Sequence, residues 1–439
     1  MENHNTHHLN KQISELALPN IITNITVPLL GIVDLAIVGH LGNELYIGAI
    51  AIGTMIFNMI YWNFGFLRAG TGGLTAQAYG AGNIDETAKI FVRASIVALT
   101  ISVLLISLQV PMAKISKIVV NGDEQMINMA LKYFYIRIWA APATLGMYTI
   151  KGWFIGMQDS KLPMWISIIL NILNIVSSLI FVYVFNKGIA GVALGTVLAQ
   201  YSGLLAAIFF WFKTYGFVRA KINFKDSINL NDYKHFFKIN TDIFLRTLCL
   251  TAVFTFIPAI SARMGNRILA INTLLMQLFT IFSYILDGYA YAGEALVGKF
   301  IGAKNKTSLI KTVRYLTYWG MSITIVFTIL YVAFGKNILS LLTNDSDVIL
   351  NSMDYIHWAV LVPICGFLAF IFDGIYIGAT ASKAMRNTIF IATMSFFVSY
   401  YTLHPVLHND AVWIALLIFL LLRGILLLAG VKKNIYNLV

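Results

Sequence analysis

Long apolar runs separated by short polar segments make up almost the whole chain. A helix rises about 1.5 Å per residue, so about 20 residues are needed to cross a hydrocarbon core of roughly 30 Å. Runs of that length fall near 15–39, 45–66, 90–112, 129–150, 163–185, 189–212, 239–262, 268–291, 313–334, 349–372, 384–403 and 411–430. This pattern predicts an all-α polytopic membrane protein with twelve transmembrane helices.

Charged residues are too few for a soluble protein. The chain is 59% hydrophobic and 11% charged, whereas soluble domains carry about 25% charged residues. Most Lys and Arg fall on one set of alternate loops, so the positive-inside rule predicts that both termini are cytoplasmic. The net charge of +12 is therefore interpreted as an orientation signal rather than a nucleic-acid footprint. A few basic residues, among them Arg137, Arg246 and Arg423, fall within or at the ends of the apolar runs.

Cysteine usage gives no sign of a metal or disulfide framework. Cys249 and Cys365 lie far apart inside apolar runs. We therefore expect neither a disulfide nor a metal site, and no cofactor.

The chain contains an internal repeat with one constant displacement. KGWFIGMQDSK at 151–161 resembles DGIYIGATASK at 373–383, and the same displacement pairs Asn83 with Asn305. Each repeat contains an even number of crossings, so the two halves should have the same orientation and be related by a parallel pseudo-two-fold repeat. The expected parts are a cytoplasmic N-terminal tail (1–14), an N-lobe (15–212), a cytoplasmic linker (213–238), a C-lobe (239–430) and a cytoplasmic C-terminal tail (431–439).

The first apolar run contains one carboxylate. Between Leu16 and Val38 the only ionisable residue is Asp34. An acid inside the bilayer costs about 2.5 kcal/mol or more and usually marks an ion or substrate path. The alternative is an acid that only hydrogen-bonds a neighbouring helix. Pro19 and Pro28 lie in the same run and predict a helix that can bend.

A second polar group lies on the fifth predicted helix. Asn171, Asn174 and Ser178 share one helical face, and Thr196 on the sixth helix can add a hydroxyl. Hydrogen bonds between helices are one explanation, worth about 0.6 kcal/mol each in membranes. The functional alternative is that an amide near Asp34 supports both its ionised and its protonated form.

The second half contains its own acids, and they suggest a competing sodium site. Asp287 and Glu294 are seven residues apart, so they share a helical face that can line the cytoplasmic mouth of a cavity. Asp373 lies near the inner end of its helix, where we favour an ion pair with Lys383 or Arg386 over ion coupling.

Several segments together resemble the multidrug and toxic compound extrusion (MATE) transporters, and within them the DinF-like (DNA-damage-inducible protein F) branch. These segments are SELALPNIITNITVPLLGIVDLAIVGHLG at 14–42, FLRAGTGGLTAQAYGAGN at 66–83, YIRIWAAPA at 135–143, NILNIVSS at 171–178, LDGYAYAGEALVGKFIGAKN at 286–305 and FDGIYIGATASKAMRN at 372–387. The resemblance implies two six-helix lobes that export organic cations or amphipathic toxins against inward protons or sodium ions.

The resemblance also implies roles for individual residues. It places the family's first-helix coupling carboxylate on Asp34, its helix-one bend on Pro19, its helix-five asparagine on Asn174 and its helix-six hydroxyl on Thr196. Where many relatives carry a second acid on helix five, this chain has Ser178. We therefore expect a site that rests mainly on Asp34.

We expect a bacterial inner-membrane antiporter, a monomer, that exports small organic cationic or amphipathic compounds against inward protons by alternating access. The alternatives are a sodium-coupled exporter with a cation site in the C-lobe and a lipid-linked sugar flippase. A flippase would need several cavity Arg or Lys for an anionic pyrophosphate, and mid-helix charges are few. An enzyme is not expected, since neither HExxH nor GxSxG occurs.

Overall fold

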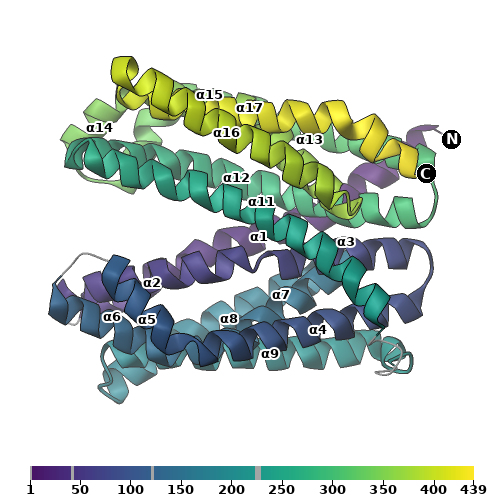
Figure 1. Ribbon diagram of the computed structural model, residues 1–439, viewed down its shortest axis with the longest axis horizontal. Coiled ribbons are helices and arrows are strands. Elements are labelled where there is room, and N and C mark those ends of the chain that lie inside the picture. The colour runs from purple at the N-terminus through teal and green to yellow at the C-terminus, as the bar shows by residue number, and fades with distance from the viewer. Residues whose placement is uncertain (1, 41–43, 120–122, 223–228) are drawn as a thin grey trace. The chain divides into compact units, whose positions relative to one another are not determined.

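The computed structural model describes residues 2–40, 44–119, 123–222 and 229–439, and these residues form helices joined by short turns (Figure 1). Within them, eleven helical stretches are long and apolar enough to cross a membrane. The predicted all-α polytopic architecture is therefore confirmed. Residues 223–228 of the expected linker lie outside the described residues.

The crossing predicted near 129–150 is built differently from the others. It consists of α6 (Glu124–Arg137), the 3-10 turn η1 (Ile138–Ala140) and α7 (Ala141–Gly156), which follow one another directly. Each piece is shorter than a single-helix crossing requires. The fourth apolar run is thus helical over a sufficient length but changes its helical geometry after Arg137.

The chain divides into two compact units, Ile22–Phe237 (the N-terminal unit) and Met1–Ile21 with Lys238–Val439 (the C-terminal unit). Helix α1 (Glu2–Gly39) contributes to both and stays helical through Pro19 and Pro28. The expected bend at Pro19 stays a prediction.

The N-terminal unit continues from α1 through a series of helices. Besides α6, η1 and α7 these are α2 (Glu44–Asn63), α3 (Phe66–Gly80), α4 (Ile84–Ser107), α5 (Gln109–Val119), α8 (Lys161–Leu179), the π-helical turn η2 (Ile180–Val184) and α9 (Ile189–Arg219). Helix α7 packs against α3, α4 and α9, while α2 packs on α6 and α8 on α9.

The C-terminal unit is also helical over its described residues. Its elements are α11 (Leu230–Arg263), α12 (Asn266–Gly302), α13 (Lys306–Leu342), α14 (Ser346–Met353), α15 (Ile356–Gly378), α16 (Ser382–Leu407), α17 (Asn409–Asn434) and the 3-10 turn η3 (Tyr436–Leu438). Helix α15 lies at the centre, because it packs against α12, α13 and α17.

The sequence repeat reappears as a repeated contact between helices. A Cβ added to Gly152 of α7 would collide with the backbone oxygen of Arg68 in α3. A Cβ added to Gly374 of α15 would collide in the same way with the backbone oxygen of Ala290 in α12. Gly374 follows Gly152 by the same displacement as Ala290 follows Arg68, and this is the displacement of the sequence repeat. Glycine allows this close approach in each unit, so the predicted internal repeat is confirmed in local packing.

Two long helices, α4 and α13, begin with the same capping residue at equivalent positions of the repeat. The side chain of Asn83 caps α4 by accepting a 3.0 Å hydrogen bond from the backbone N–H of Glu86. Asn305, the repeat counterpart of Asn83, caps α13 by accepting a 3.0 Å bond from the backbone N–H of Ser308. Such caps satisfy backbone donors that the first helical turn leaves without a partner.

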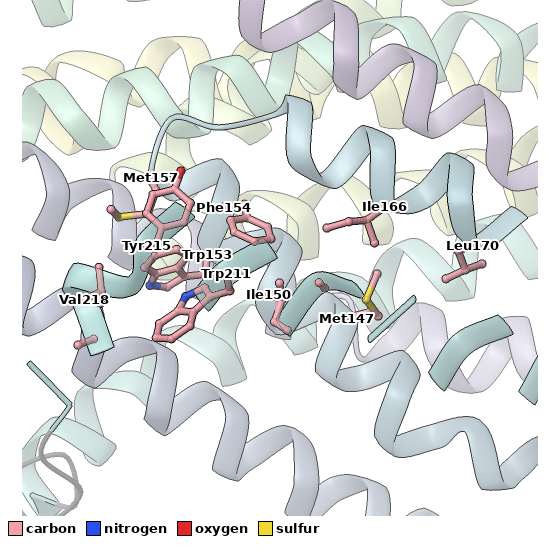
Figure 2. Close-up of a cluster of buried hydrophobic side chains, with 12 residues drawn as sticks. Met147, Ile150, Trp153, Phe154, Met157, Ile166, Leu170, Trp211, Tyr215 and Val218 are labelled. Atoms are coloured by element: carbon pink, nitrogen blue, oxygen red, sulfur yellow. The ribbon is translucent and has the colours of Figure 1, made fainter. Parts of the chain in front are cut away.

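An aromatic cluster forms part of the core of the N-terminal unit (Figure 2). Its centre is Trp153 of α7, whose ring centroid lies 5.8 Å from Trp211 and 4.9 Å from Tyr215 in α9. The Trp153 indole N–H donates a 2.9 Å hydrogen bond to the backbone oxygen of Thr87 in α4. These contacts fix α7 between α4 and α9.

Candidate functional site

The carboxyl group of Asp34 is buried in the second half of α1. Asp34 is 7% exposed, and its Oδ1 accepts no hydrogen bond from the residues that the structure describes. Burial of a charged carboxylate is costly unless a nearby charge compensates it or a proton neutralises it. The environment of Asp34 therefore decides what this group can do.

Arg137 is the last residue of α6 and lies in the same unit as Asp34. The Arg137 guanidinium donates a 2.6 Å hydrogen bond from Nη1 to the hydroxyl oxygen of Tyr133, one helical turn earlier. Its Cζ lies 4.7 Å from the ring centroid of Phe57 in α2. In the sequence, Arg137 is recognisable only as a basic residue within or at the end of an apolar run, and no role was expected for it.

Four aromatic residues form what we call the aromatic cradle: Phe57 and Tyr61 of α2 with Tyr133 and Phe134 of α6. Phe57 stacks on Tyr61 at 5.5 Å and on Phe134 at 5.4 Å between ring centroids, and it meets the edge of Tyr133 at 6.3 Å. Aromatic faces attract cations. Two members of the cradle, Phe57 and Tyr133, thus contact the Arg137 guanidinium through uncharged groups.

Two hydrogen bonds fasten this half of α1 to its neighbours. Asn171 of α8 donates from Nδ2 to the backbone oxygen of Thr26 at 3.1 Å. The hydroxyl of Tyr183 in η2 donates to the backbone oxygen of Ile37, also at 3.1 Å. The earlier residue of α8 and η2 binds the earlier residue of α1, and the later binds the later, so α8 with η2 runs parallel to α1. Asp34 lies on α1 between the two attachment points.

Asn174 and Thr196 are brought together between α8 and α9, as the sequence suggested. Asn174 donates from Nδ2 to Thr196 Oγ1 at 3.0 Å, and the Thr196 hydroxyl donates to the backbone oxygen of Val192 at 3.1 Å. The Asn174 Oδ1 is buried and accepts no hydrogen bond from any described residue. This buried oxygen can still accept a hydrogen bond.

Ser178 lies in a tight contact between two helices. Its side chain is fully buried, and a Cβ added to Gly195 of α9 would collide with the Ser178 side chain and backbone. The Ser178 hydroxyl has no hydrogen-bond partner among the described residues. The helix-five position where many relatives are expected to carry an acid is thus packed against α9 in this protein.

In the C-terminal unit, Asp373 is paired with two arginines. It contacts Arg246 of α11 and Arg423 of α17, and Asp373 and Arg423 are both buried. The charge of Asp287 also acts on Arg423. A sodium ion at Asp373 would therefore meet two guanidinium groups.

The predicted ion pair of Asp373 with Lys383 or Arg386 is wrong. Arg386 instead binds Asp242 at 2.7 Å, and the Ser382 hydroxyl donates to the same carboxylate at 2.9 Å. The prediction failed because it used nearness in sequence, whereas the packing of α15 on α17 brings Arg423 to Asp373.

Glu294 is fully buried in α12, where its backbone oxygen lies against Gly378 of α15. The prediction that Asp287 and Glu294 line a cytoplasmic mouth stays a prediction. Within the described ranges, no group of three or more His, Cys, Asp or Glu side chains is arranged to hold a metal ion.

The chain matches one protein-family model and resembles known proteins over most of its length. The MatE family model matches residues 19–180 and 243–402. The DNA damage-inducible protein F of Escherichia coli is 36% identical over 427 residues, which are 97% of this chain and 93% of that protein. The multidrug and toxin extrusion protein 1 of Oryctolagus cuniculus is 24% identical over 76% of this chain and 58% of its own length.

Solved structures support the fold. A MATE crystal structure in a bent conformation matches with a TM-score of 0.85 over 98% of this chain and 96% of that chain, at 20% identity. Because the family model covers most of the chain and a relative of similar length is more than one-third identical, this multi-pass membrane protein belongs to the MatE family of multidrug and toxin efflux transporters.

Proposed function

We propose that this protein is a secondary active exporter of small organic cationic or amphipathic compounds, driven by inward movement of protons through alternating access. Asp34 is the group that couples the two movements. The protein acts as a monomer in the bacterial inner membrane with both termini in the cytoplasm. The observation that carries this proposal is the buried carboxyl of Asp34, whose Oδ1 accepts no hydrogen bond from the described residues.

The physical basis is competition for one carboxylate. Ionised Asp34 attracts a cationic compound, because the interaction of opposite charges is strong where water is excluded. A proton arriving from outside neutralises the acid and removes that attraction. The compound is then released outward, and the proton is later released inward. A single carboxyl is sufficient for this exchange.

The surroundings of Asp34 fit this exchange. Asn171 and Tyr183 attach α1 to α8 and η2 on either side of Asp34, through backbone oxygens rather than through the acid itself. The carboxyl therefore keeps acceptor capacity for a proton or a cation while the helix that carries it is held in position.

Sodium coupling through the C-terminal acids is less well supported. Sodium, like other hard cations, requires several oxygen ligands with net negative charge. Asp373 is already paired with Arg246 and Arg423, whose two positive charges oppose a bound cation. This arrangement favours protons as the coupling ion.

Efflux from membrane vesicles tests the proposal. Everted vesicles carrying the protein are given a proton gradient in sodium-free buffer, or a sodium gradient without a proton gradient, and accumulation of a fluorescent lipophilic cation is followed. We expect transport with the proton gradient, and transport at background in Asp34→Asn. The matched control is Glu15→Gln, which removes an exposed acid from the same helix. Transport only with the sodium gradient would contradict the proposal.

A further inference from the structure

The first turns of α4 and α13 occupy equivalent positions of the repeat but differ in charge. In α4, Glu86 binds Arg93 at 2.8 Å, and Asp85 binds Lys221 at 3.4 Å. The two equivalent positions of α13 carry hydroxyl side chains instead of acids. The two helices therefore share an asparagine cap, but only α4 begins with acids that pair with basic residues.

Basic residues gather around the start of α13 without acids nearby in the chain. They are Lys304, Lys306, Lys311 and Arg314, and three of these four positions are uncharged in the first repeat. No Asp or Glu occurs between residues 295 and 344. Lys311 is half-buried and the other three are exposed. The second repeat has thus gained positive charge where the first has a balance of charges.

The end of α17 adds two exposed cations, Lys432 and Lys433, and residues 411–439 contain no acid. The turn η3 that follows packs against both α17 and α13. Lys306 donates a 2.8 Å hydrogen bond from Nζ to the backbone oxygen of Val439, so the two helix ends lie together. We call these six residues the basic patch: Lys304, Lys306, Lys311, Arg314, Lys432 and Lys433.

Two lysines of the basic patch occupy positions that do not favour them. Lys304 has a φ of 52°, in the left-handed region that favours glycine, and its repeat counterpart is Gly82 with a φ of 69°. Lys306 is the first residue of α13, where the helix dipole favours negative charge. The turn and the helix therefore do not account for positive charge at this place.

An exposed apolar stripe continues from the basic patch along α13. Tyr318 is 54% exposed, Ile325 54% and Val332 70%, and all three share a helical face with Arg314. Helix α13 is long and apolar enough to cross a membrane. A hydrocarbon chain that lies along this stripe has its end at the basic patch.

We propose that the basic patch binds the phosphate head group of an anionic phospholipid, whose acyl chain lies along the exposed stripe of α13. Lys and Arg bind phosphate oxygens through charge-assisted hydrogen bonds, and basic groups at the end of a membrane helix attract anionic lipids. A soluble phosphate would use the patch alone, whereas a phospholipid uses both the patch and the stripe. The site does not involve Asp34, so it is independent of the proposed coupling.

A general excess of basic residues on the inner side of a membrane does not explain the basic patch. Each repeat contains an even number of crossings, so equivalent ends should lie on the same side and experience the same preference. Only the second repeat carries the unbalanced charge. The first repeat therefore supplies a matched control within the same molecule.

The experiment measures the melting temperature of the purified full-length protein in detergent during titration with dioleoylphosphatidylglycerol. Parallel titrations use dioleoylphosphatidylcholine and glycerol 3-phosphate. We expect phosphatidylglycerol to raise the melting temperature more than phosphatidylcholine does, because a ligand that binds only the folded protein stabilises it. Glycerol 3-phosphate should leave the melting temperature unchanged at the same concentrations.

Variants at equivalent positions locate the effect. Arg314→Gln and Lys311→Gln should each raise the phosphatidylglycerol concentration that gives half of the effect roughly fivefold. Lys89→Gln removes the lysine of α4 that corresponds to Lys311 and should respond like the wild type. Lys304→Gly should not lower the melting temperature without lipid, because glycine suits this turn, yet it should weaken the response to phosphatidylglycerol.

Three results would overturn the proposal. An unchanged lipid response in Arg314→Gln, Lys311→Gln and Lys304→Gly would show that the basic patch does not bind the lipid. If Lys89→Gln weakens the response as much as Lys311→Gln does, the attraction is a general one of the basic surface. Equal stabilisation by glycerol 3-phosphate would identify a soluble phosphate, rather than a phospholipid, as the ligand.

Discussion

Asn171 of α8 donates a hydrogen bond from Nδ2 to the backbone oxygen of Thr26 in α1, 3.1 Å away. This bond attaches the half of α1 that carries Asp34 to the helix that carries Asn174. An asparagine expected from its helical face to serve the site directly therefore binds the backbone of the helix that carries Asp34.

Asn171→Ala should lower export more than it lowers stability. A hydrogen bond between helices in membranes is worth about 0.6 kcal/mol, so the melting temperature should fall by only about one or two degrees. Export should fall clearly, because α1 is then less well aligned with α8. Thermal melting and vesicle transport are measured on the same preparation, with Asn58→Ala, an exposed asparagine of α2, as control. Unchanged transport would show that this attachment is not needed.

Ser178→Asp should reduce folding yield and stability rather than restore a second coupling acid. The position is fully buried against Gly195, so an aspartate adds volume and a charge where neither fits. The cost of an acid inside the membrane is about 2.5 kcal/mol or more. Ser178→Ala is the matched variant and should be tolerated, since the hydroxyl has no partner among the described residues. Expression and melting measurements check both, and a fully stable Ser178→Asp would disprove this packing.

Asp373→Asn should destabilise the protein without changing its coupling ion. Removing the carboxylate leaves Arg246 and Arg423 without their shared partner, and breaking a buried ion pair costs about 3–5 kcal/mol. Adding Arg423→Met to Asp373→Asn should recover part of that loss. Melting temperatures of the single and double variants test this expectation. Recovery of Asp373→Asn by sodium but not by potassium would instead indicate a sodium site.

Gly374→Ala and Gly152→Ala should each destabilise the protein, because the same close approach occurs in both repeats. The added methyl group would meet a backbone oxygen, which cannot move aside as a flexible side chain can. Overpacking of this kind costs about 1–3 kcal/mol. Gly216→Ala is the control, since nothing lies within 4 Å of its added Cβ. Equal melting temperatures for all three variants would contradict the repeated contact.

The sequence predicted those features that depend on local pattern. Apolar runs long enough to cross a bilayer indicated the helices, and the constant displacement between matching segments indicated the repeat. The burial of Asp34 followed from its position as a single acid in an apolar run. The contact of Asn174 with Thr196 followed from the polar faces of adjacent helices.

Features that depend on packing between distant segments were not predictable. Arg137 ends α6 inside the fourth apolar run, and the sequence does not show that its guanidinium lies over the ring of Phe57 in α2. The spacing of Tyr133 and Arg137, four residues apart, does indicate their hydrogen bond, because it places both side chains on one helical face. The partners of Asp373 were missed for the same reason, because Arg246 is 127 residues away in the chain.

Proton movement driven by a substrate tests most directly whether Asp34 couples export to protons. Purified protein is reconstituted in sodium-free liposomes with a pH-sensitive dye inside, and a tetraphenylphosphonium gradient is imposed across the membrane. We expect the wild type and Glu15→Gln to move protons against the cation, while Asp34→Asn, folded and inserted, moves none. Substrate-driven proton movement of normal rate in Asp34→Asn, or movement in the wild type only after sodium is added, would contradict this expectation.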